Sequence, residues 1–347
     1  MIDFRYHLVS IVAVFLALAI GIVLGSAELQ GTTIDGLHAL SNSLKNQLSD
    51  AEAQRNTYAQ LSGASDTFLA GAESKLVSGY LTGDRLVLVT EPGASSSVIS
   101  GIEQAAGLAG ATVTGTVALQ PKFNDLSGAT QSNLSTINQQ EAAANGASLA
   151  SPAASQTLYQ QQAAQLIASA VLDQSAGDLG LSGSQAQLLL QAYAQAGYLN
   201  VNGNVTDRAT LAVIVTPQTA PSDGSGDPAN QVLLAVATQF AAASAATLVT
   251  GSTAGSAASG SAISVLRGSS VSSQVSSVDN ADTTLGQISS IWALATQLAG
   301  GKPNSYGISG ASAVAPAVPS EPSVSASPSS TPSTKATGKV KQTVGNK

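Results

Sequence analysis

Cysteine is absent from the 347 residues, methionine occurs only as Met1, and the two histidines are His7 and His38. Without cysteine the chain can form no disulfide framework, no thiolate zinc site and no thiol nucleophile. A serine nucleophile in residues 80–309 would need a base other than histidine, because that stretch contains none. We therefore predict that the protein is not an enzyme and holds no cofactor.

Aromatic and charged residues are also scarce, at 4% and 10% of the chain, and the net charge is −7. A negative protein surface repels phosphate groups, so the composition argues against a nucleic-acid partner. The length is sufficient for one large or two small domains with a sizeable core.

The longest apolar run, Leu8–Ala27, contains no charged residue. As a helix with about 1.5 Å rise per residue it would cover roughly 30 Å, the thickness of the hydrocarbon core of a bilayer. Arg5 precedes it, which predicts a cytoplasmic amino terminus and an extracytoplasmic location for residues 28–347. A cleaved signal peptide ending near Gly25-Ser26-Ala27 is the alternative, but the run is longer than the roughly 7–15 residues typical of one. We predict a single-pass membrane protein in which residues 1–27 form a cytoplasmic head and a transmembrane helix.

Residues 28–79 carry a heptad pattern typical of a helical, coiled-coil stalk. With Leu37 at position a, eight of the twelve a and d positions are apolar. The a positions are Leu37, Leu44, Ala51, Tyr58, Ser65 and Ala72, and the d positions are Leu40, Gln47, Gln54, Leu61, Phe68 and Lys75. We predict that the stalk joins two copies of the chain in a homodimer. A single amphipathic helix lying on its own domain is the alternative.

Residues 80–309 alternate short apolar strands with helices, which predicts an α/β domain with a doubly wound, mostly parallel sheet of about five strands. The expected strands are 86–90, 111–119, 210–216, 246–250 and 273–278. Residues 121–207 are interpreted as a helical insertion, with helices near 129–143, 155–175 and 184–196 and a strand-like segment at Tyr198–Val201. Asp282 is expected to cap the last helix, whose apolar face runs from Leu285 to Leu298.

Three segments are expected to meet at the carboxyl edge of this sheet, where open α/β sheets bind ligands. They are Thr90–Gly93, the small-residue loop Gly251–Ser256, and the group Asp279, Asn280 and Asp282. The loop lacks the lysine of a phosphate loop and the G-x-G-x-x-G of a dinucleotide site, so we interpret it as a plain connection. Acidic side chains at the edge could hold a cation, but Asp282 has a capping role and Asp279-Asn280 can form a turn. We predict neither a metal site nor a cofactor site.

Residues 310–347 consist mostly of Ser, Pro, Ala, Thr and Lys. Such a segment cannot bury enough apolar surface to fold, so we predict a disordered tail. Four lysines make its tip basic, namely Lys335, Lys339, Lys341 and Lys347. Electrostatic contact with an anionic wall polymer is a second interpretation of the tail.

Two segments carry a resemblance to a known family. Arg5-Tyr6-His7 runs into a Val/Leu/Ala-rich helix that ends in Gly25-Ser26, and Ser276–Gly301 contains Val-Asp-Asn-Ala-Asp before a helix. On these features the chain resembles the actinobacterial copper transport protein B family over about residues 1–309. The resemblance implies a membrane-anchored envelope protein of copper homeostasis and copper transport, in a family also described as an outer-membrane channel.

Copper finds few suitable ligands in the exported part of the chain. Cu(I) prefers thiolate and thioether ligands, and imidazole suits copper more generally. Residues 28–347 contain one imidazole, His38, and neither cysteine nor methionine. Copper binding inside the fold is therefore not predicted. The alternative from composition alone is a non-catalytic envelope scaffold or regulator that binds a cell-wall or division partner through the stalk and the domain.

Overall fold

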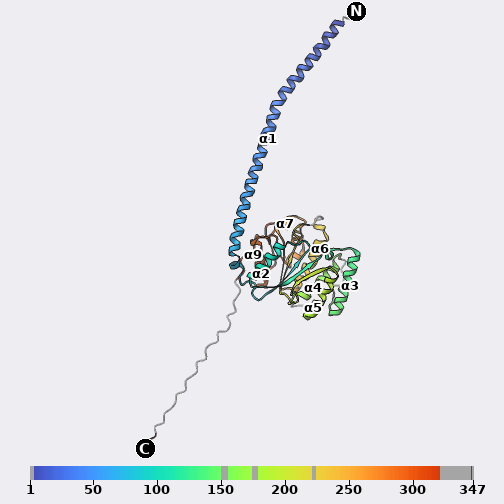
Figure 1. Ribbon diagram of the computed structural model, residues 1–347, viewed down its shortest axis with the longest axis vertical. Coiled ribbons are helices and arrows are strands. Elements are labelled where there is room, and N and C mark those ends of the chain that lie inside the picture. Colours follow the sequence, from blue (N-terminus) through green and yellow to red (C-terminus); the bar gives the residue numbers. More distant parts are fainter. Residues whose placement is uncertain (1–3, 150–154, 174–178, 221–223, 321–344, 346–347) are drawn as a thin grey trace. The chain divides into compact units, whose positions relative to one another are not determined.

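The computed structural model describes residues 4–149, 155–173, 179–220, 224–320 and 345. The chain divides into two compact units, Met1–Phe68 and Leu69–Lys347, which are described separately. The first unit is helical, and the second is an α/β domain built on one sheet (Figure 1).

Helix α1 runs without interruption from Phe4 to Val77 and carries both the predicted membrane span and the predicted stalk. The first proline of the chain is Pro92, so no proline ring breaks the helix. The segment Arg5–Ser26 is long and apolar enough to cross a membrane, and it is the one such helix in the part of the chain that the structure describes. One amino-terminal apolar helix of this kind suggests single-pass anchoring.

The last turns of α1 belong to the second unit. Leu69, Leu76 and Val77 lie on one face of the helix and pack against the core of that unit. Nε1 of Trp292 donates a hydrogen bond to the carbonyl oxygen of Leu76 at 2.9 Å. This end of α1 is therefore held by apolar packing and by a specific hydrogen bond.

The sheet of the second unit contains seven strands in the order β3-β2-β1-β4-β5-β6-β7. Their bounds are β1 Arg85–Thr90, β2 Thr112–Leu119, β3 Leu199–Gly203, β4 Leu211–Val215, β5 Ala246–Thr250, β6 Ser276–Val278 and β7 Ser305–Tyr306. All neighbours pair in parallel except β2 and β3, which are antiparallel. The mostly parallel sheet is confirmed, but the expected count of about five strands is too low, because the short edge strands β3 and β7 extend the sheet.

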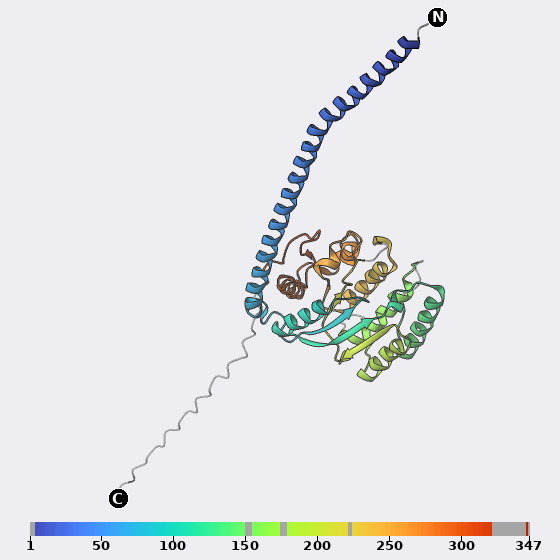
Figure 2. The ribbon, with the colours of Figure 1, turned by 45° about the horizontal axis from the view of Figure 1, so that its top comes forward.

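Helices cover both faces of this sheet (Figure 2). One face is packed by α4 (Leu158–Val171), α5 (Gly183–Gln195), α6 (Pro228–Ala243) and α8 (Ala262–Arg267), and the other by α2 (Ser96–Leu108) and α9 (Thr284–Leu298). Within β1, Val87 and Val89 contribute to the first core and Leu86 and Leu88 to the second. Successive side chains of a strand point to opposite faces, so a strand covered on both sides is apolar throughout.

The helical insertion lies between β2 and β4 and consists of α3 (Gly128–Asn145), α4, α5 and the strand β3. Two buried tyrosines hold its elements together by hydrogen bonds to α3. The Tyr193 hydroxyl donates to Oδ1 of Asn138 at 2.7 Å, and the Tyr198 hydroxyl donates to the Thr130 carbonyl at 3.0 Å. Their rings fill the core while their hydroxyls find partners, as buried tyrosines require. The carboxyl end of the helix expected at 155–175 falls partly outside the described residues.

Four short elements complete the domain. They are η1 Pro121–Asn124, η2 Gly224–Gly226, α7 Thr253–Ser256 and η3 Ser270–Ser273. After β7 the chain turns back, and the Ser312 N–H donates to Oγ of Ser305 at 3.0 Å. Most of the predicted disordered tail, residues 321–344 and 346–347, lies outside the described residues.

Candidate functional site

Strands β1, β4, β5 and β6 end side by side at the carboxyl edge of the sheet. The segments that follow them are joined by backbone hydrogen bonds: Glu91 N donates to Val215 O at 3.0 Å, and Gly251 N donates to Val278 O at 3.1 Å. The segments Thr90–Gly93 and Gly251–Ser256 and the residue Asp279 therefore meet at one edge, as the sequence led us to expect. Their side chains do not form one common site.

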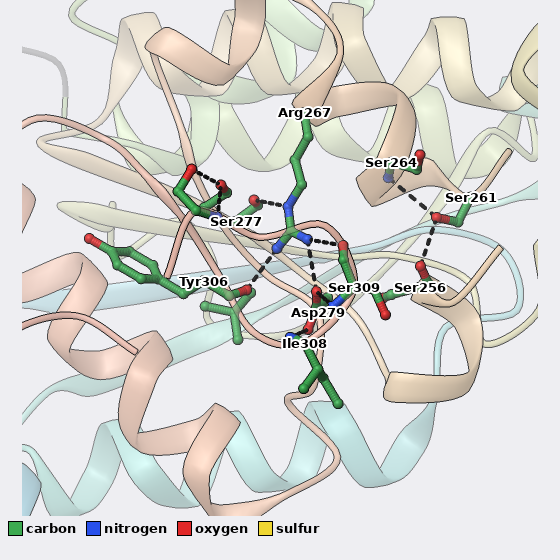
Figure 3. A network of polar contacts seen from close by, with 12 residues as sticks. Ser256, Ser261, Ser264, Arg267, Ser277, Asp279, Tyr306, Ile308 and Ser309 are labelled. Atoms are coloured by element: carbon green, nitrogen blue, oxygen red, sulfur yellow. Dashed lines mark hydrogen bonds and ion pairs between the residues drawn. The ribbon is translucent and has the colours of Figure 1, made fainter. Parts of the chain in front are cut away.

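Asp279, at the end of β6, forms a buried ion pair with Arg267 of α8 (Figure 3). Nη1 of Arg267 lies 2.8 Å from Oδ2 of Asp279, and the Asp279 side chain is fully buried. The carboxylate also accepts hydrogen bonds from the N–H groups of Ile308 at 2.8 Å and Ser309 at 2.7 Å. Three donors thus surround the carboxylate of Asp279.

The guanidinium of Arg267 also binds the backbone at and after β7 and a side chain of β6 (Figure 3). It donates to the carbonyl oxygens of Tyr306 at 2.7 Å and Ser309 at 2.6 Å, and to Oγ of Ser277 at 2.9 Å. Gly307 has φ 124°, and a Cβ at this position would collide with the Asp279 carboxylate. We call this set of contacts the Arg267–Asp279 clip. It fastens the chain after β7 to the sheet edge and engages both carboxylate oxygens of Asp279.

The cap predicted for Asp282 is wrong. The amino-terminal cap of α9 is Thr283, whose side chain accepts a hydrogen bond from Gly286 N at 3.1 Å. Oδ1 of Asp282 instead accepts from the N–H and the hydroxyl of Thr253, each at 2.8 Å. Asp282 therefore links the segment after β6 to the start of α7, which is a contact between distant segments that local spacing does not reveal.

The loop Gly251–Ser256 contains α7 and is packed rather than open. Oγ of Ser252 accepts from Gly255 N at 3.1 Å and so caps this single turn. A Cβ on Gly255 would meet the carbonyl oxygens of Pro217 and Gln218 at 2.5 and 2.9 Å. Gly255 therefore allows the backbone of the loop to approach its neighbours closely, which supports the interpretation of the loop as a plain connection.

Glu91 lies at the point where the chain changes winding direction, between β1 and β4. Its side chain is 4% exposed. Burial raises the pKa of Glu91 to about 8, and the negative charge of Asp227 contributes to the same shift. Glu91 therefore retains its proton at neutral pH. The sequence placed Glu91 at the sheet edge but gave no signal of its burial.

A groove of about 550 Å³ lies between α5 and β3, on the side of the domain formed by the insertion. Its polar lining consists of amide and hydroxyl side chains, and its apolar lining includes Leu190, Val201 and Val205. None of its lining residues carries a charge. The sequence analysis did not identify this groove, because it depends on how the insertion packs beside the edge strand.

The stalk presents an exposed apolar stripe. Its large a and d side chains, Leu37, Leu40, Leu44, Tyr58, Leu61 and Phe68, are 55–76% exposed. A shallow groove of about 380 Å³ follows Leu37, Leu40, Leu44 and Leu48. His38 lies on the same stretch and is exposed. Among the described residues, no group of three or more His, Cys, Asp or Glu side chains is placed to hold a metal ion.

Comparison with known proteins relates this chain to one family. The sequence model of a family described as "Copper transport outer membrane protein, MctB" matches residues 1–316. The chain belongs to the MctB family. Proteins named "Copper transporter MctB" from Mycobacterium tuberculosis (strain ATCC 25618 / H37Rv) and Mycobacterium bovis (strain ATCC BAA-935 / AF2122/97) are 30% identical over 313 residues, which cover 88% of this chain and 96% of each relative. The protein of the same name from Mycobacterium leprae (strain TN) is 30% identical over 314 residues, covering 89% and 96%.

The matched range begins at residue 1 and ends after β7. It therefore includes α1, the whole sheet and the Arg267–Asp279 clip. The family is described as a transport protein and not as a family of enzymes. Membership in the MctB family confirms the resemblance drawn from Arg5-Tyr6-His7 and the segment around Asp279.

Proposed function

We propose that this chain is a membrane-anchored protein of the cell envelope that takes part in copper transport and copper homeostasis, without a catalytic step of its own. The family match along residues 1–316 carries the proposal. Relatives named copper transporters are aligned over 96% of their length, which supports a shared role for the whole chain. A strain that lacks the protein should show altered cell copper content and greater sensitivity to copper, both reversed by the full chain. Unchanged copper content and tolerance would refute the proposal.

The orientation of the chain follows from its charges. Arg5 lies directly before the apolar segment, so by the positive-inside rule the amino terminus is cytoplasmic and residues 28–347 lie outside the cytoplasm. A reporter that is active only outside the cytoplasm, fused after Lys347, should be active. Mass analysis of the mature protein should also find Arg5 still attached to the stalk. A mature protein that begins near Glu28 would indicate a cleaved signal peptide.

The copper role does not operate through a soft-ligand site in the fold. The exported part contains neither cysteine nor methionine, and its one imidazole, His38, is exposed on the stalk. The carboxylate of Asp279 is occupied by Arg267 and two backbone N–H groups. We therefore propose that copper is cargo handled by an assembly that contains this chain. Replacement of His38 by alanine should leave copper tolerance intact, and loss of tolerance in His38→Ala would show direct ligation.

The stalk forms that assembly as a homodimer. Six large apolar side chains at a and d positions are exposed in the single chain, and anchoring by Arg5–Ser26 confines copies to one membrane. Light scattering of the full chain in detergent should give the mass of a dimer. Leu44→Asp and Leu61→Asp should give monomers, whereas Asn56→Asp, at the outer f position, should remain dimeric.

A second candidate function is a non-catalytic scaffold that binds a cell-wall or division partner. The uncharged groove between α5 and β3 favours it, because a groove of this kind is available for a partner outside the membrane. The deletion strain distinguishes the two functions. Normal copper content together with cells that fail to separate would favour the scaffold and eliminate transport.

A further inference from the structure

The charged residues of the stalk show a regular placement relative to the heptad. Between Gly36 and Phe68 the charges Lys45, Glu52 and Asp66 all fall at position b, on the outer surface of the helix. Only Asp50 and Arg55 fall at positions g and e, which flank the apolar seam. Both side chains are exposed.

We infer that the stalk dimer is parallel and in register, and that Asp50 of each copy pairs with Arg55 of the other. This inference rests on the proposed homodimer and adds its orientation and register. In a parallel two-stranded coiled coil, a g residue of one helix faces the e residue five positions further along the second helix. Asp50 and Arg55 are separated by five residues and carry opposite charges. The two-fold symmetry of the dimer produces this pair twice.

The pair cannot form within one helix. Side chains that meet on a helix surface are three or four residues apart, whereas residues five apart point in clearly different directions. Of the residues the structure describes, neither Asp50 nor Arg55 takes part in an ion pair. Their charges are therefore available to a second copy.

The same charges disfavour other arrangements. In an antiparallel dimer, g positions face g positions, so Asp50 would approach the g side of the second helix and lose Arg55 as its neighbour. A shift of one heptad would place Asp50 opposite Leu48 or Ser62, which carry no charge. The membrane span at the amino end of α1 favours the parallel arrangement, because both copies enter the stalk from the same side.

Charge exchange tests the inference on the full chain in detergent. Asp50→Arg and Arg55→Asp should each weaken dimerisation by roughly tenfold, because each variant places like charges at both contacts. The double variant Asp50→Arg/Arg55→Asp should restore wild-type dimerisation. Lys45→Glu at position b is the matched control and should leave the dimer unchanged. Equal effects of the b-position control and the two single variants would overturn the inference.

Cysteine cross-linking tests orientation separately, because the natural chain contains no cysteine. Disulfides need Cα atoms closer than about 7 Å. In the parallel, in-register dimer, Leu40→Cys and Leu61→Cys should each cross-link to the same residue of the second copy, and Asn42→Cys and Asn56→Cys at position f should not. An antiparallel dimer can bring at most one such position opposite itself, so a cross-link at only one of Leu40 and Leu61 would refute the parallel arrangement.

The two proposals fail in distinguishable ways. A chain that is monomeric by light scattering and gives no cross-link at any of the four positions would refute the homodimer, and the register with it. A dimer that survives Asp50→Arg and Arg55→Asp unchanged would refute the register and retain the homodimer.

Discussion

Replacement of Arg267 by methionine should lower the stability of the α/β domain by about 3–5 kcal/mol, the range found when one partner of a buried ion pair is removed. Methionine keeps an unbranched apolar stem but removes the charge. Asp279 would remain fully buried with only the N–H groups of Ile308 and Ser309 as donors. The carbonyl oxygens of Tyr306 and Ser309 would lose their guanidinium donor as well. The segment after β7 would then be held to Asp279 only through its own two N–H groups.

Urea unfolding of the full chain in detergent measures this loss, with fluorescence of Trp292 as the probe. Trp292 is the one tryptophan of the chain and lies in α9 within the same domain. Asp173→Ala is the matched control, because it breaks the exposed pair with Arg85, whose atoms are 3.4 Å apart, and should cost less than about 1 kcal/mol. The double variant Arg267→Met/Asp279→Leu should lose less than the sum of its single variants, because no charge remains buried. The reasoning is wrong if Arg267→Met costs no more than Asp173→Ala.

Three further predictions test other parts of the molecule. The pKa of Glu91 is raised from 4.5 to about 8, so between these pH values the folded state binds one more proton than the unfolded state, and the free energy of unfolding falls as the pH rises. Glu91→Gln should reduce this fall between pH 5 and pH 8, as measured by urea unfolding. An equal fall in the variant and the wild type would contradict the prediction. Gly307→Ala should destabilise the domain by more than Gly310→Ala, because both glycines have positive φ but only the first lies against the Asp279 carboxylate; similar unfolding midpoints would exclude that contact. In copper-tolerance assays, His38→Ala should behave like the wild type and Leu44→Asp should not, and the opposite ranking would favour direct ligation.

The parallel strands could be predicted because each is a short run of apolar residues between turn signals. Leu86–Thr90 and Leu211–Val215 are buried on both faces, and their short length and content of β-branched residues distinguish them from a buried helix. The edge strands β3 and β7 were harder to predict from the sequence. The strand-like segment expected at Tyr198–Val201 overlaps β3, but only Leu199 of β3 is buried, so its place in the sheet was not predicted. Strand β7 has two residues, too few to give a hydrophobic pattern. Both depend on pairing with a neighbour that is distant in sequence.

The candidate site shows the same division between local and distant information. The topology rule for α/β sheets correctly brought Glu91, Gly251 and Asp279 to one edge. The partners of these side chains could not be predicted, because Arg267 reaches Asp279 from α8 and Asp282 reaches Thr253 from the segment after β6. One local signal was missed: Thr283 precedes the helix directly and has the side chain of a good cap, so it competed with Asp282 for that role.

Helix α1 is one continuous element whose sequence suits a different environment in each of three stretches. From Leu8 to Ala27 it is apolar on all sides, as a lipid-embedded helix must be. Between Leu37 and Phe68 the apolar residues narrow to a stripe, which suits contact with a second copy. From Leu69 to Val77 the buried face shifts to the residues that pack on the α/β domain. The expected effect of a charged substitution in α1 therefore follows from its position. It should impair membrane insertion in the first stretch, the proposed dimer in the second, and the stability of the domain in the third.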